Sequence, residues 1–266
     1  MKIWAQTIVC NEDKFIWFAI MSVIDYVDKV MVWDTGSTDD TVKIIKEIQK
    51  IKGDKVLFKE VGPVDRDGLT RMRQKMLEET NADWFILVDG DEVWWETSIK
   101  QLVEAIKQQG SQKDAVVVPF FNPLGDIYHY QDESASRYQI AGRKGNFQVR
   151  AINKKLPGLH VKNSYPLEGY YDENGQIVQE SDKLLLLDAP YLHATHLRRS
   201  NELRKYNKYK FELGKDFGSD FKYPEVFYRE KPSIVSSPLI KRSTIYVINS
   251  LLQTPLIYVK RKILKK

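Results

Sequence analysis

Three carboxylates in four positions follow a short apolar run, and they are the part of this chain best suited to bind a metal ion. The run extends from Trp84 to Val88, and Asp89, Asp91 and Glu92 come directly after it. A short, uninterrupted apolar run is typical of a strand buried on both faces, as in a parallel sheet covered by helices. Side chains two apart on an extended chain point the same way, so Asp89 and Asp91 should converge. Two hard oxygen donors close together suit Mg²⁺ or Mn²⁺.

The Asp-Gly pair at this point has a second interpretation. Asp-Gly between two apolar runs is also a strong signal for a β-hairpin. The second run is only three residues long, Val93 to Trp95, and a helical pattern begins after it at Glu96. This favours the metal-site interpretation, in which Gly90 also lets other groups approach the backbone.

A second acidic site is expected after the apolar run that ends at Trp33. Asp34 and the residues TGSTDDT follow that run, and a helical pattern comes next. The segment lacks the glycine-rich motifs that bind phosphates at a helix N-terminus, and its aspartates would repel a pyrophosphate. Asp34, at the carboxyl end of its strand, can instead accept hydrogen bonds from ribose hydroxyls or a base N–H. Asp39 and Asp40 are expected only to complement the helix dipole.

Two histidines late in the chain are candidate metal ligands. His193 and His196 follow the apolar run Leu184 to Leu187. A histidine at a strand end could complete a carboxylate metal site. A purely structural role for the pair is the alternative.

The periodicity of the chain predicts an α/β fold. In residues 1–120, apolar runs alternate with helical patterns, which predicts a mostly parallel central sheet flanked by helices, as in Rossmann-like folds. From Asn122 to Arg143 the pattern is irregular, and Phe147 to Ile152 alternates as an antiparallel strand would. We therefore expect mixed or antiparallel additions in the second half. A helix is also expected from Ser200 to Gly214.

The composition is that of an ordinary globular protein. The chain has 266 residues, 42% of them hydrophobic, which is enough for one large α/β domain or two small ones. The single cysteine, Cys10, excludes an internal disulfide, and its place after an apolar strand predicts a buried thiol in a reducing compartment. Since the N-terminus shows no secretion signal and no apolar stretch approaches the ~20 residues of a membrane span, a cytoplasmic location is expected.

The basic charge is concentrated at the C-terminal end. The chain carries a net charge of +5, residues 231–266 hold eight basic and no acidic side chains, and residues 1–230 therefore carry −3. Residues 244–266 place apolar side chains at helical spacing and end in the cluster KRKILKK. An apolar face beside cations is typical of a helix on an anionic membrane surface, where each basic residue contributes roughly 1 kcal/mol. The alternative is a helix docked on the rest of the protein with a basic end.

The chain resembles the family 2 glycosyltransferases. The resemblance rests on four features taken together: the pair Asn11-Glu12, the segment DTGSTDDT at 34–41, the segment DGDE at 89–92 and a late histidine. The resemblance is good for residues 1–120 and weaker to about residue 214, and it implies the A-type nucleotide-diphosphosugar transferase fold. It implies that a nucleotide-sugar is bound by Asn11, Glu12, Asp34, Arg73 and Asp89. It implies that the metal is held by Asp89, Asp91 and His196, with His193 as the alternative to His196. Many members have Arg-Asn where this chain has Arg73-Gln74, so the diphosphate contact of Arg73 rests on half of that motif.

The family's inverting mechanism needs a general base that deprotonates the acceptor hydroxyl. Some relatives carry a His-Glu pair after an arginine-rich strand, but here His160 is followed by valine. Glu168 is therefore the first candidate and His160 the second, and a simple loop position is the alternative for either.

The sequence as a whole predicts a metal-dependent, inverting glycosyltransferase that moves a sugar from a nucleotide-diphosphosugar, with a UDP-sugar favoured, to a hydroxyl of a cell-envelope glycan or lipid-linked saccharide. The catalytic domain is expected at 1–230, with a nucleotide-binding half at 1–120 and an acceptor-binding half at 121–230, followed by a basic amphipathic tail at 231–266. Residues 241–266 would contact an anionic membrane and make the protein peripheral on its inner face, and no nucleic acid partner is expected.

Two alternatives to this function remain. One is a sugar nucleotidyltransferase, although the segment at 8–12 lacks the glycine-rich, basic loop of that class. The other is a non-catalytic, membrane-associated glycan-binding module, and the intact Asp34, Asp89 and Asp91 argue against it.

Overall fold

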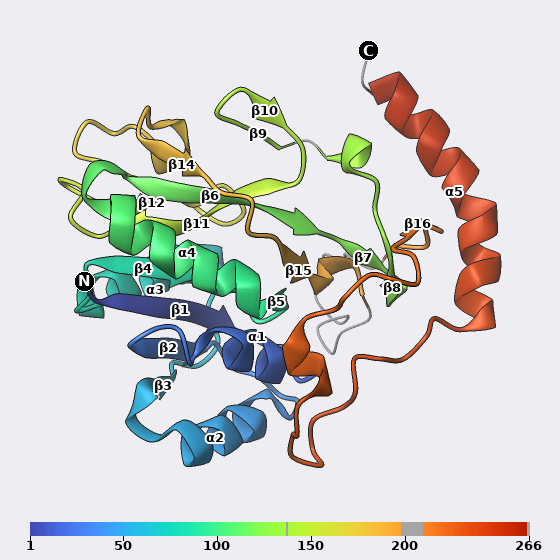
Figure 1. The fold of residues 1–266 in the computed structure, drawn as a ribbon, viewed down its shortest axis with the longest axis horizontal. Helices are drawn as coiled ribbons and strands as arrows, with labels where there is room; N and C mark the ends of the chain where they lie inside the picture. Colours follow the sequence, from blue (N-terminus) through green and yellow to red (C-terminus); the bar gives the residue numbers. More distant parts are fainter. Residues whose placement is uncertain (137, 198–209, 265–266) are drawn as a thin grey trace.

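The computed structural model describes residues 1–136, 138–197 and 210–264, and it shows an α/β protein built around one large sheet (Figure 1). Strands and helices alternate through the first half of the chain, as the periodicity predicts. The elements are β1 (Ile3–Val9), α1 (Ile16–Val23), β2 (Lys29–Asp34), α2 (Thr41–Lys52), β3 (Val56–Glu60), α3 (Arg66–Glu79), β4 (Trp84–Leu87), β5 (Glu92–Trp94), α4 (Glu96–Gln109) and β6 (Ala115–Phe121).

The second half consists mainly of strands, and one long helix ends the described chain. The elements are β7 (Pro123–Leu124), β8 (Asp126–Tyr130), β9 (Gln139–Ile140), β10 (Arg143–Lys144), β11 (Phe147–Asn153), β12 (His160–Lys162), β13 (Gly169–Tyr171), β14 (Leu184–Leu186), β15 (Tyr191–His193), β16 (Lys215–Asp216) and α5 (Thr244–Leu264). The mixed character expected for this half is confirmed.

The central sheet has nine strands in the order β3-β2-β1-β4-β11-β6-β15-β5, with β14 also paired to β6. β1, β2, β3 and β4 are parallel, and β14 and β15 are parallel to β6. β11 runs antiparallel between β4 and β6. The predicted fold class, a mostly parallel sheet with antiparallel additions, is confirmed. Because β2 and β4 both pair with β1, Asp34 and Asp89 follow strands that are separated by one strand.

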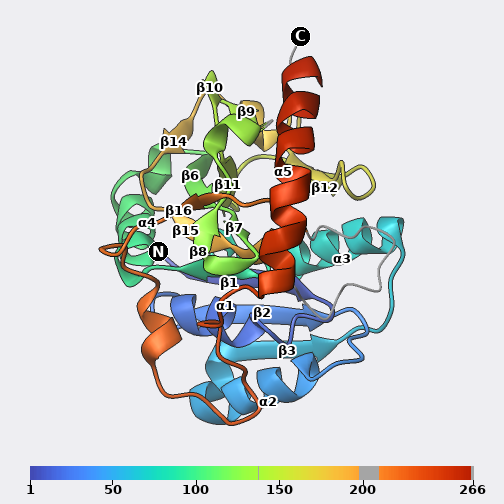
Figure 2. The ribbon, with the colours of Figure 1, turned by 90° about the vertical axis from the view of Figure 1, so that its right-hand side faces the viewer.

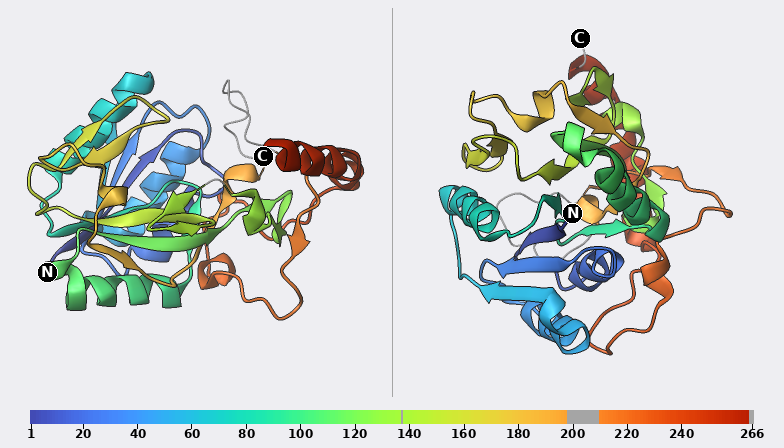
Figure 3. Two further views of the ribbon diagram at one scale, coloured as in Figure 1. Left: turned by 90° about the horizontal axis from the view of Figure 1, so that it is seen from above. Right: turned by 60° about the vertical axis from the view of Figure 1, so that its left-hand side comes forward.

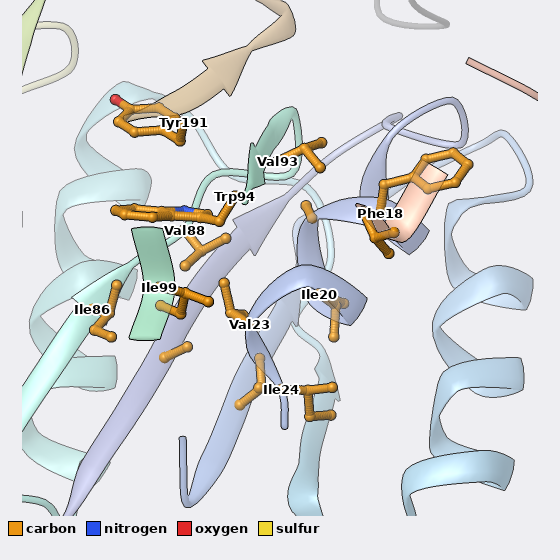
Figure 4. Packing of buried hydrophobic residues seen from close by; sticks show 14 of the residues in the cluster. Phe18, Ile20, Val23, Ile24, Ile86, Val88, Val93, Trp94, Ile99 and Tyr191 are labelled. Atoms are coloured by element: carbon orange, nitrogen blue, oxygen red, sulfur yellow. The ribbon is translucent and has the colours of Figure 1, made fainter. Parts of the chain in front are cut away.

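Helices cover both faces of the sheet, as the view from above shows, with α3 on one side and α4 on the other (Figure 3). The alternate residues Val30 and Val32 of β2 belong to the main core with α1, α2 and α4, whereas Met31 packs with Met76 of α3 on the opposite face. Strands buried on both faces explain the uninterrupted apolar runs. Figure 4 shows the main core, where the rings of Trp94 and Tyr191 stack 5.0 Å apart.

The Asp-Gly turn does not close a hairpin. β4 pairs with β1 and β11, and β5 pairs with β15 instead of folding back on β4. The apolar run at 184–187 forms β14, and a further strand, β15, follows it and contains His193. The helix expected from Ser200 lies mostly on residues outside the described part of the chain, and Leu213 and Gly214, which are described, are not helical.

The helix α5 lies at one end of the molecule, outside the layers of the α/β body (Figures 1 and 2). It begins at Thr244, whereas Val235, inside the expected tail, is 1% exposed and belongs to the main core. Within the described residues, no helix combines the length and apolarity that a membrane crossing requires.

Candidate active site

Asp34 ends β2 and organises the loop that follows it. Its carboxylate is 2% exposed, and its Oδ2 accepts hydrogen bonds from the backbone N–H groups of Gly36 and Ser37, both at 2.9 Å. Its Oδ1 accepts a hydrogen bond from the Ser37 hydroxyl. Gly36 has a φ of +89°, and a Cβ there would meet Pro63 at 2.9 Å, so this turn requires glycine. Three of the roughly four lone-pair positions of Asp34 are therefore used within the loop itself.

Asn11 joins this loop to the end of β1. Its backbone N–H donates to Ser37 Oγ at 2.8 Å, and its side-chain Oδ1 accepts from the Thr38 N–H at 2.7 Å. Asn11 has a φ of +56°, a conformation that asparagine tolerates better than most residues. The side chain of Asn11 therefore fixes the shape of the segment at 34–38.

Glu12 lies between the Asp34 loop and the Asp89 turn. Its backbone N–H donates to Thr41 Oγ1 at 2.8 Å, and its side chain is buried. A Cβ added to Gly90 would meet Glu12 Cγ at 3.1 Å, closer than nine in ten such contacts. The close approach expected at Gly90 is thus made by Glu12, which connects the two acidic segments in space.

Asp89 lies between two guanidinium groups. Its Oδ1 is 3.6 Å from Arg73 of α3, and its Oδ2 is 3.5 Å from Arg150 of β11. The side chain of Asp89 is 34% exposed, whereas those of Arg73 and Arg150 are 18% and 8% exposed. Two cations from different elements therefore converge at the carboxyl end of β4.

Arg150 is positioned by a β-bulge. Val149 pairs with Val117 and Ala151 with Val116, so Arg150 is the extra residue of β11. Such bulges change the direction in which a side chain points.

The Arg150 guanidinium is held in a buried polar network. It donates to Glu92, to Gln148 and, at 2.9 Å, to the Tyr191 hydroxyl, which in turn donates to Gln148 at 2.6 Å. Burial raises the pKa of Glu92 well above its ordinary value, Arg150 opposes the increase, and Asp89 adds to it. Burial also raises the pKa of Tyr191, so its hydroxyl keeps its proton.

Asp91 lies beside His193 at the junction of β5 and β15. The distance from Asp91 Oδ2 to His193 Nε2 is 3.6 Å, and the Ala194 N–H donates to the Asp91 carbonyl at 2.8 Å. His196, three residues farther along, has its Nε2 2.8 Å from Lys210 Nζ. His193 thus makes a close approach to the Asp91 carboxylate.

The donor set of Asp91 and His193 fits a divalent cation that is completed by a substrate. Within the described ranges, no group of three or more His, Cys, Asp or Glu residues is arranged to hold a metal. Mg²⁺ is usually bound through one or two carboxylates together with substrate phosphates, at about 2.0 to 2.1 Å, so adjacent ligands lie about 3 Å apart. Asp91 and His193 come close to that separation, whereas Asp89 is engaged by two arginines.

Glu168 and Asp89 approach different nitrogens of the Arg73 guanidinium. The Oε1 of Glu168 is 3.7 Å from Arg73 Nε, and the Glu168 side chain is 11% exposed. His160 belongs to β12, where its Nδ1 is 2.8 Å from the Gly158 carbonyl oxygen. Glu168 lines a cavity beside Asp89, Arg73 and Arg150, and His160 does not line it.

A cavity of about 290 Å³ brings Arg73, Asp89, Arg150 and Glu168 together. The described residues that line it do not include the other predicted site residues, Asn11, Glu12, Asp34, Asp91, His160, His193 and His196. The polar and charged side chains of its wall include Arg73 of α3, Asp89 after β4, Gln148 and Arg150 of β11, Glu168 before β13 and Tyr170 of β13.

The sequence did not predict Arg150, Gln148 and Tyr191 as parts of the site, and it suggested a metal-binding role for Glu92, which instead pairs with Arg150. Two of them could have been found, because Gln148 and Arg150 are polar residues two apart in the alternating segment Phe147 to Ile152. Tyr191 offered no such signal, since a tyrosine in a three-residue strand is an ordinary core residue.

Acidic loops after β2 and β4 and a cavity lined with arginines define the class: this is the arrangement of a glycosyltransferase with the A-type fold. The chain belongs to glycosyl transferase family 2, whose family model matches residues 6–164, well over half of its length. The match includes Asp34, Arg73, Asp89, Asp91 and Arg150, and it ends before Glu168 and His193.

One solved structure shows the same fold at low sequence identity. S. aureus TarS 1-349 in complex with UDP-GlcNAc has a TM-score of 0.51 at 14% identity, over 78% of this chain and 60% of that one. Glucosyl-3-phosphoglycerate synthase from Mycobacterium tuberculosis, in complex with Mn²⁺, UDP-Glc and phosphoglyceric acid, has a TM-score of 0.44 at 20% identity, over 72% of this chain and 71% of that one. The chain thus spans about 60% of the TarS structure. Among curated proteins there is no significant match.

Proposed function

We propose that the protein is a metal-dependent, inverting glycosyltransferase that moves a sugar from a UDP-sugar to a hydroxyl of a glycan or lipid-linked saccharide. The observation that carries this proposal is the cavity that Arg73, Arg150, Asp89 and Glu168 line together. Guanidinium groups are suited to bind a diphosphate, and a carboxylate is suited to take the proton of an attacking hydroxyl. One cavity therefore offers groups for both ends of the reaction.

The donor nucleoside is assigned to the loop after β2. In this proposal Asp34, held by Gly36 and Ser37, fixes the loop and directs its remaining acceptor position to the ribose or base. Asn11 and Glu12 connect this loop with the Asp89 turn, so the nucleoside and the diphosphate can lie along one continuous surface. The preference for UDP extends to this chain what is bound in the TarS complex.

Arg73 and Arg150 are the proposed diphosphate contacts. Both lie within 3.6 Å of an Asp89 oxygen, and both are largely buried, so their electrostatic attraction for a diphosphate is only weakly screened. In this arrangement they stabilise the negative charge that develops on the leaving UDP.

Asp91 and His193 are the proposed metal ligands, with Mn²⁺ or Mg²⁺ as the ion. His193 replaces His196 in this role because its Nε2 is 3.6 Å from Asp91, whereas His196 lies beside Lys210. When bound, the ion would neutralise part of the diphosphate charge. Asp89 would contact the ribose or the same ion once a donor occupies the arginines.

Glu168 is the proposed general base. Its carboxylate lies in the cavity, 3.7 Å from Arg73, where it can accept the proton of an acceptor hydroxyl as that oxygen attacks the anomeric carbon and UDP leaves. His160 remains the second candidate, although it does not line this cavity. The acceptor is assigned to the half of the chain after residue 121, which supplies Glu168 and Tyr170.

A thermal-shift panel of UDP-, GDP- and dTDP-sugars, each with and without Mn²⁺, tests the proposal. We expect stabilisation by the UDP-sugar, enhanced by Mn²⁺, because a ligand that binds only the folded state raises the melting temperature. UDP release in the presence of oligosaccharide acceptors then tests transfer. Stabilisation by a nucleoside triphosphate with a sugar 1-phosphate, and by none of the nucleotide-sugars, would instead identify a nucleotidyltransferase.

A further inference from the structure

The helix α5 turns its polar face toward the body of the protein. Tyr246 is 2% exposed, and Thr254 Oγ1 accepts a hydrogen bond from the Leu213 N–H at 3.0 Å. Farther along the same face, Arg261 donates two hydrogen bonds to Glu212, at 2.6 and 2.7 Å. Positions 246, 254 and 261 lie on one side of a helix with 3.6 residues per turn. The contacts that hold α5 in place are therefore largely polar.

The opposite face of α5 is apolar and exposed. Its side chains recur at intervals of three and four residues, which places them in one stripe along the helix. Their exposed fractions lie between 54% and 72%, for Ile245, Ile248, Leu252, Leu256, Val259 and Ile263. This is the reverse of a surface helix, which buries its apolar face against the protein. A row of this length is an interaction surface.

Two lysines flank the stripe. At about 100° per residue, Lys260 and Lys262 lie about 80° to either side of Leu252, the centre of the stripe. Both side chains are exposed, whereas Arg261 between them points to Glu212. No acidic residue occurs in the whole segment 231–266. Cations on both borders of an apolar stripe match a surface that is apolar in its interior and anionic at its boundary.

We propose that α5 is a membrane-docking helix that lies flat on an anionic lipid surface, with the stripe at 245–263 inserted and Lys260 and Lys262 at the headgroups. A second copy of the chain fits less well, because residues 231–266 contain no acidic side chain, so neither a parallel nor an antiparallel pair of α5 helices gives Lys260 and Lys262 an acidic partner on the other helix. The orientation of α5 directs the stripe away from the body, so docking requires no rearrangement of the fold. The proposal does not depend on the donor, the metal or the general base.

Vesicle sedimentation with the full chain tests the proposal. We expect binding to vesicles of phosphatidylcholine with 30% phosphatidylglycerol, and little binding to phosphatidylcholine alone. The double variant Leu252→Glu/Leu256→Glu should lose binding. Lys260→Ala/Lys262→Ala should weaken binding about 25-fold, since each basic residue near an anionic leaflet contributes a factor of about five.

Two variants serve as matched controls. Lys75→Ala/Lys107→Ala removes the same charge from exposed positions on α3 and α4 and should bind as the unmodified chain does. Gln253→Glu adds a charge on α5, about 100° from the centre of the stripe, and should have a much smaller effect than Leu252→Glu/Leu256→Glu. Equal losses in all variants would show that net charge alone drives binding and would overturn the docking geometry.

A fluorescent label reports the insertion directly. In a Cys10→Ser background, the emission of an environment-sensitive dye attached to the thiol of Leu256→Cys should shift to the blue on anionic vesicles, and that of the same dye on Gln253→Cys should shift much less. Sedimentation equilibrium without lipid tests whether the stripe instead binds a second copy of the chain. A dimer that dissociates in Leu252→Glu/Leu256→Glu, together with no vesicle binding by the unmodified chain, would assign the stripe to a second copy and overturn the proposal.

Discussion

His193 Nε2 lies 3.6 Å from Asp91 Oδ2, although the two residues are separated by about a hundred positions in the sequence. The antiparallel pairing of β5 with β15 produces this proximity, because His193 pairs with Glu92, the neighbour of Asp91. Two candidate metal ligands are thereby fixed to each other by backbone hydrogen bonds. Their distance is set by the fold before any cation arrives.

Substitution of either proposed ligand, Asp91 or His193, should weaken metal binding. We expect Asp91→Asn and His193→Ala to reduce the affinity for Mn²⁺ in the presence of UDP by tenfold or more, because each removes one of two protein ligands. Calorimetric titration of Mn²⁺ into the protein with UDP measures the effect. His196→Ala is the matched comparison and should keep the affinity, since Lys210 is its neighbour. If His196→Ala weakened Mn²⁺ binding and His193→Ala did not, the assignment of His193 as a metal ligand would be contradicted.

Glu168→Gln should abolish most of the transfer while donor binding remains. Loss of a general base lowers the rate by roughly 10² to 10⁴, whereas the amide keeps the size of the side chain near Arg73. The measurement is kcat for UDP release together with Kd for UDP. Glu173→Gln, at an exposed position after β13, is the control and should be fully active. If His160→Ala lost the activity and Glu168→Gln kept it, His160 would be the base.

Arg150→Met should destabilise the fold by about 3 to 5 kcal/mol, the usual cost of breaking a buried ion pair, because it leaves the fully buried Glu92 without its main counter-charge. Urea unfolding at neutral pH measures this loss. The double variant Arg150→Met/Glu92→Gln should recover part of it, since the buried charge is removed as well. A loss in the double variant as large as in the single variant would contradict this explanation.

The same variant should show a distinct pH dependence. Burial raises the pKa of Glu92 above 4.5 in the folded protein, and Arg150 is the group that opposes this. Without Arg150 the folded state holds the Glu92 proton more tightly than the unfolded chain does, so the free energy of unfolding falls as the pH rises above about 4.5. Unfolding curves of Arg150→Met between pH 4.5 and 8 should therefore fall more steeply than those of Arg150→Met/Glu92→Gln.

Asp34→Ala should weaken UDP binding at least tenfold and cost roughly 1 to 3 kcal/mol of stability, because the N–H groups of Gly36 and Ser37 lose their acceptor. Calorimetry with UDP and urea unfolding measure the two effects. Asp40→Asn, in the same loop, is the control: it removes only the surface ion pair with Lys43 and should leave both values nearly unchanged. Unchanged UDP affinity in Asp34→Ala would remove the loop from the nucleoside site.

The first half of the fold could be predicted because its information is local. Apolar runs that end in Asp34 and in the Asp89 turn gave both the strands and the acidic residues at their carboxyl ends, and the parallel order followed from the alternation with helices. The contact of Glu12 with Gly90, which connects the two acidic loops, was predicted only in part. The small size of glycine predicted a close approach at Gly90 but did not identify Glu12 as the residue that makes it.

The rest of the site depends on pairings between distant segments. Arg150 reaches Asp89 because of a bulge, and His193 reaches Asp91 because of the three-residue strand β15; neither feature leaves a periodic pattern in the sequence. For α5, the periodicity revealed an apolar face but not the side to which it turns. That depended on Thr254 and Arg261, whose partners lie around residue 212.

The two arginines at Asp89 have a consequence for how a nucleotide-sugar would enter. A diphosphate that binds Arg73 and Arg150 must compete with the carboxylate that already lies 3.5 to 3.6 Å from them, so binding is an exchange of anions. Separating the existing ion pairs would cancel part of the attraction for the diphosphate, so a nucleoside diphosphate product would be held less tightly. The same exchange would release Asp89 to turn toward the ribose or the cation, coupling donor entry to completion of the site.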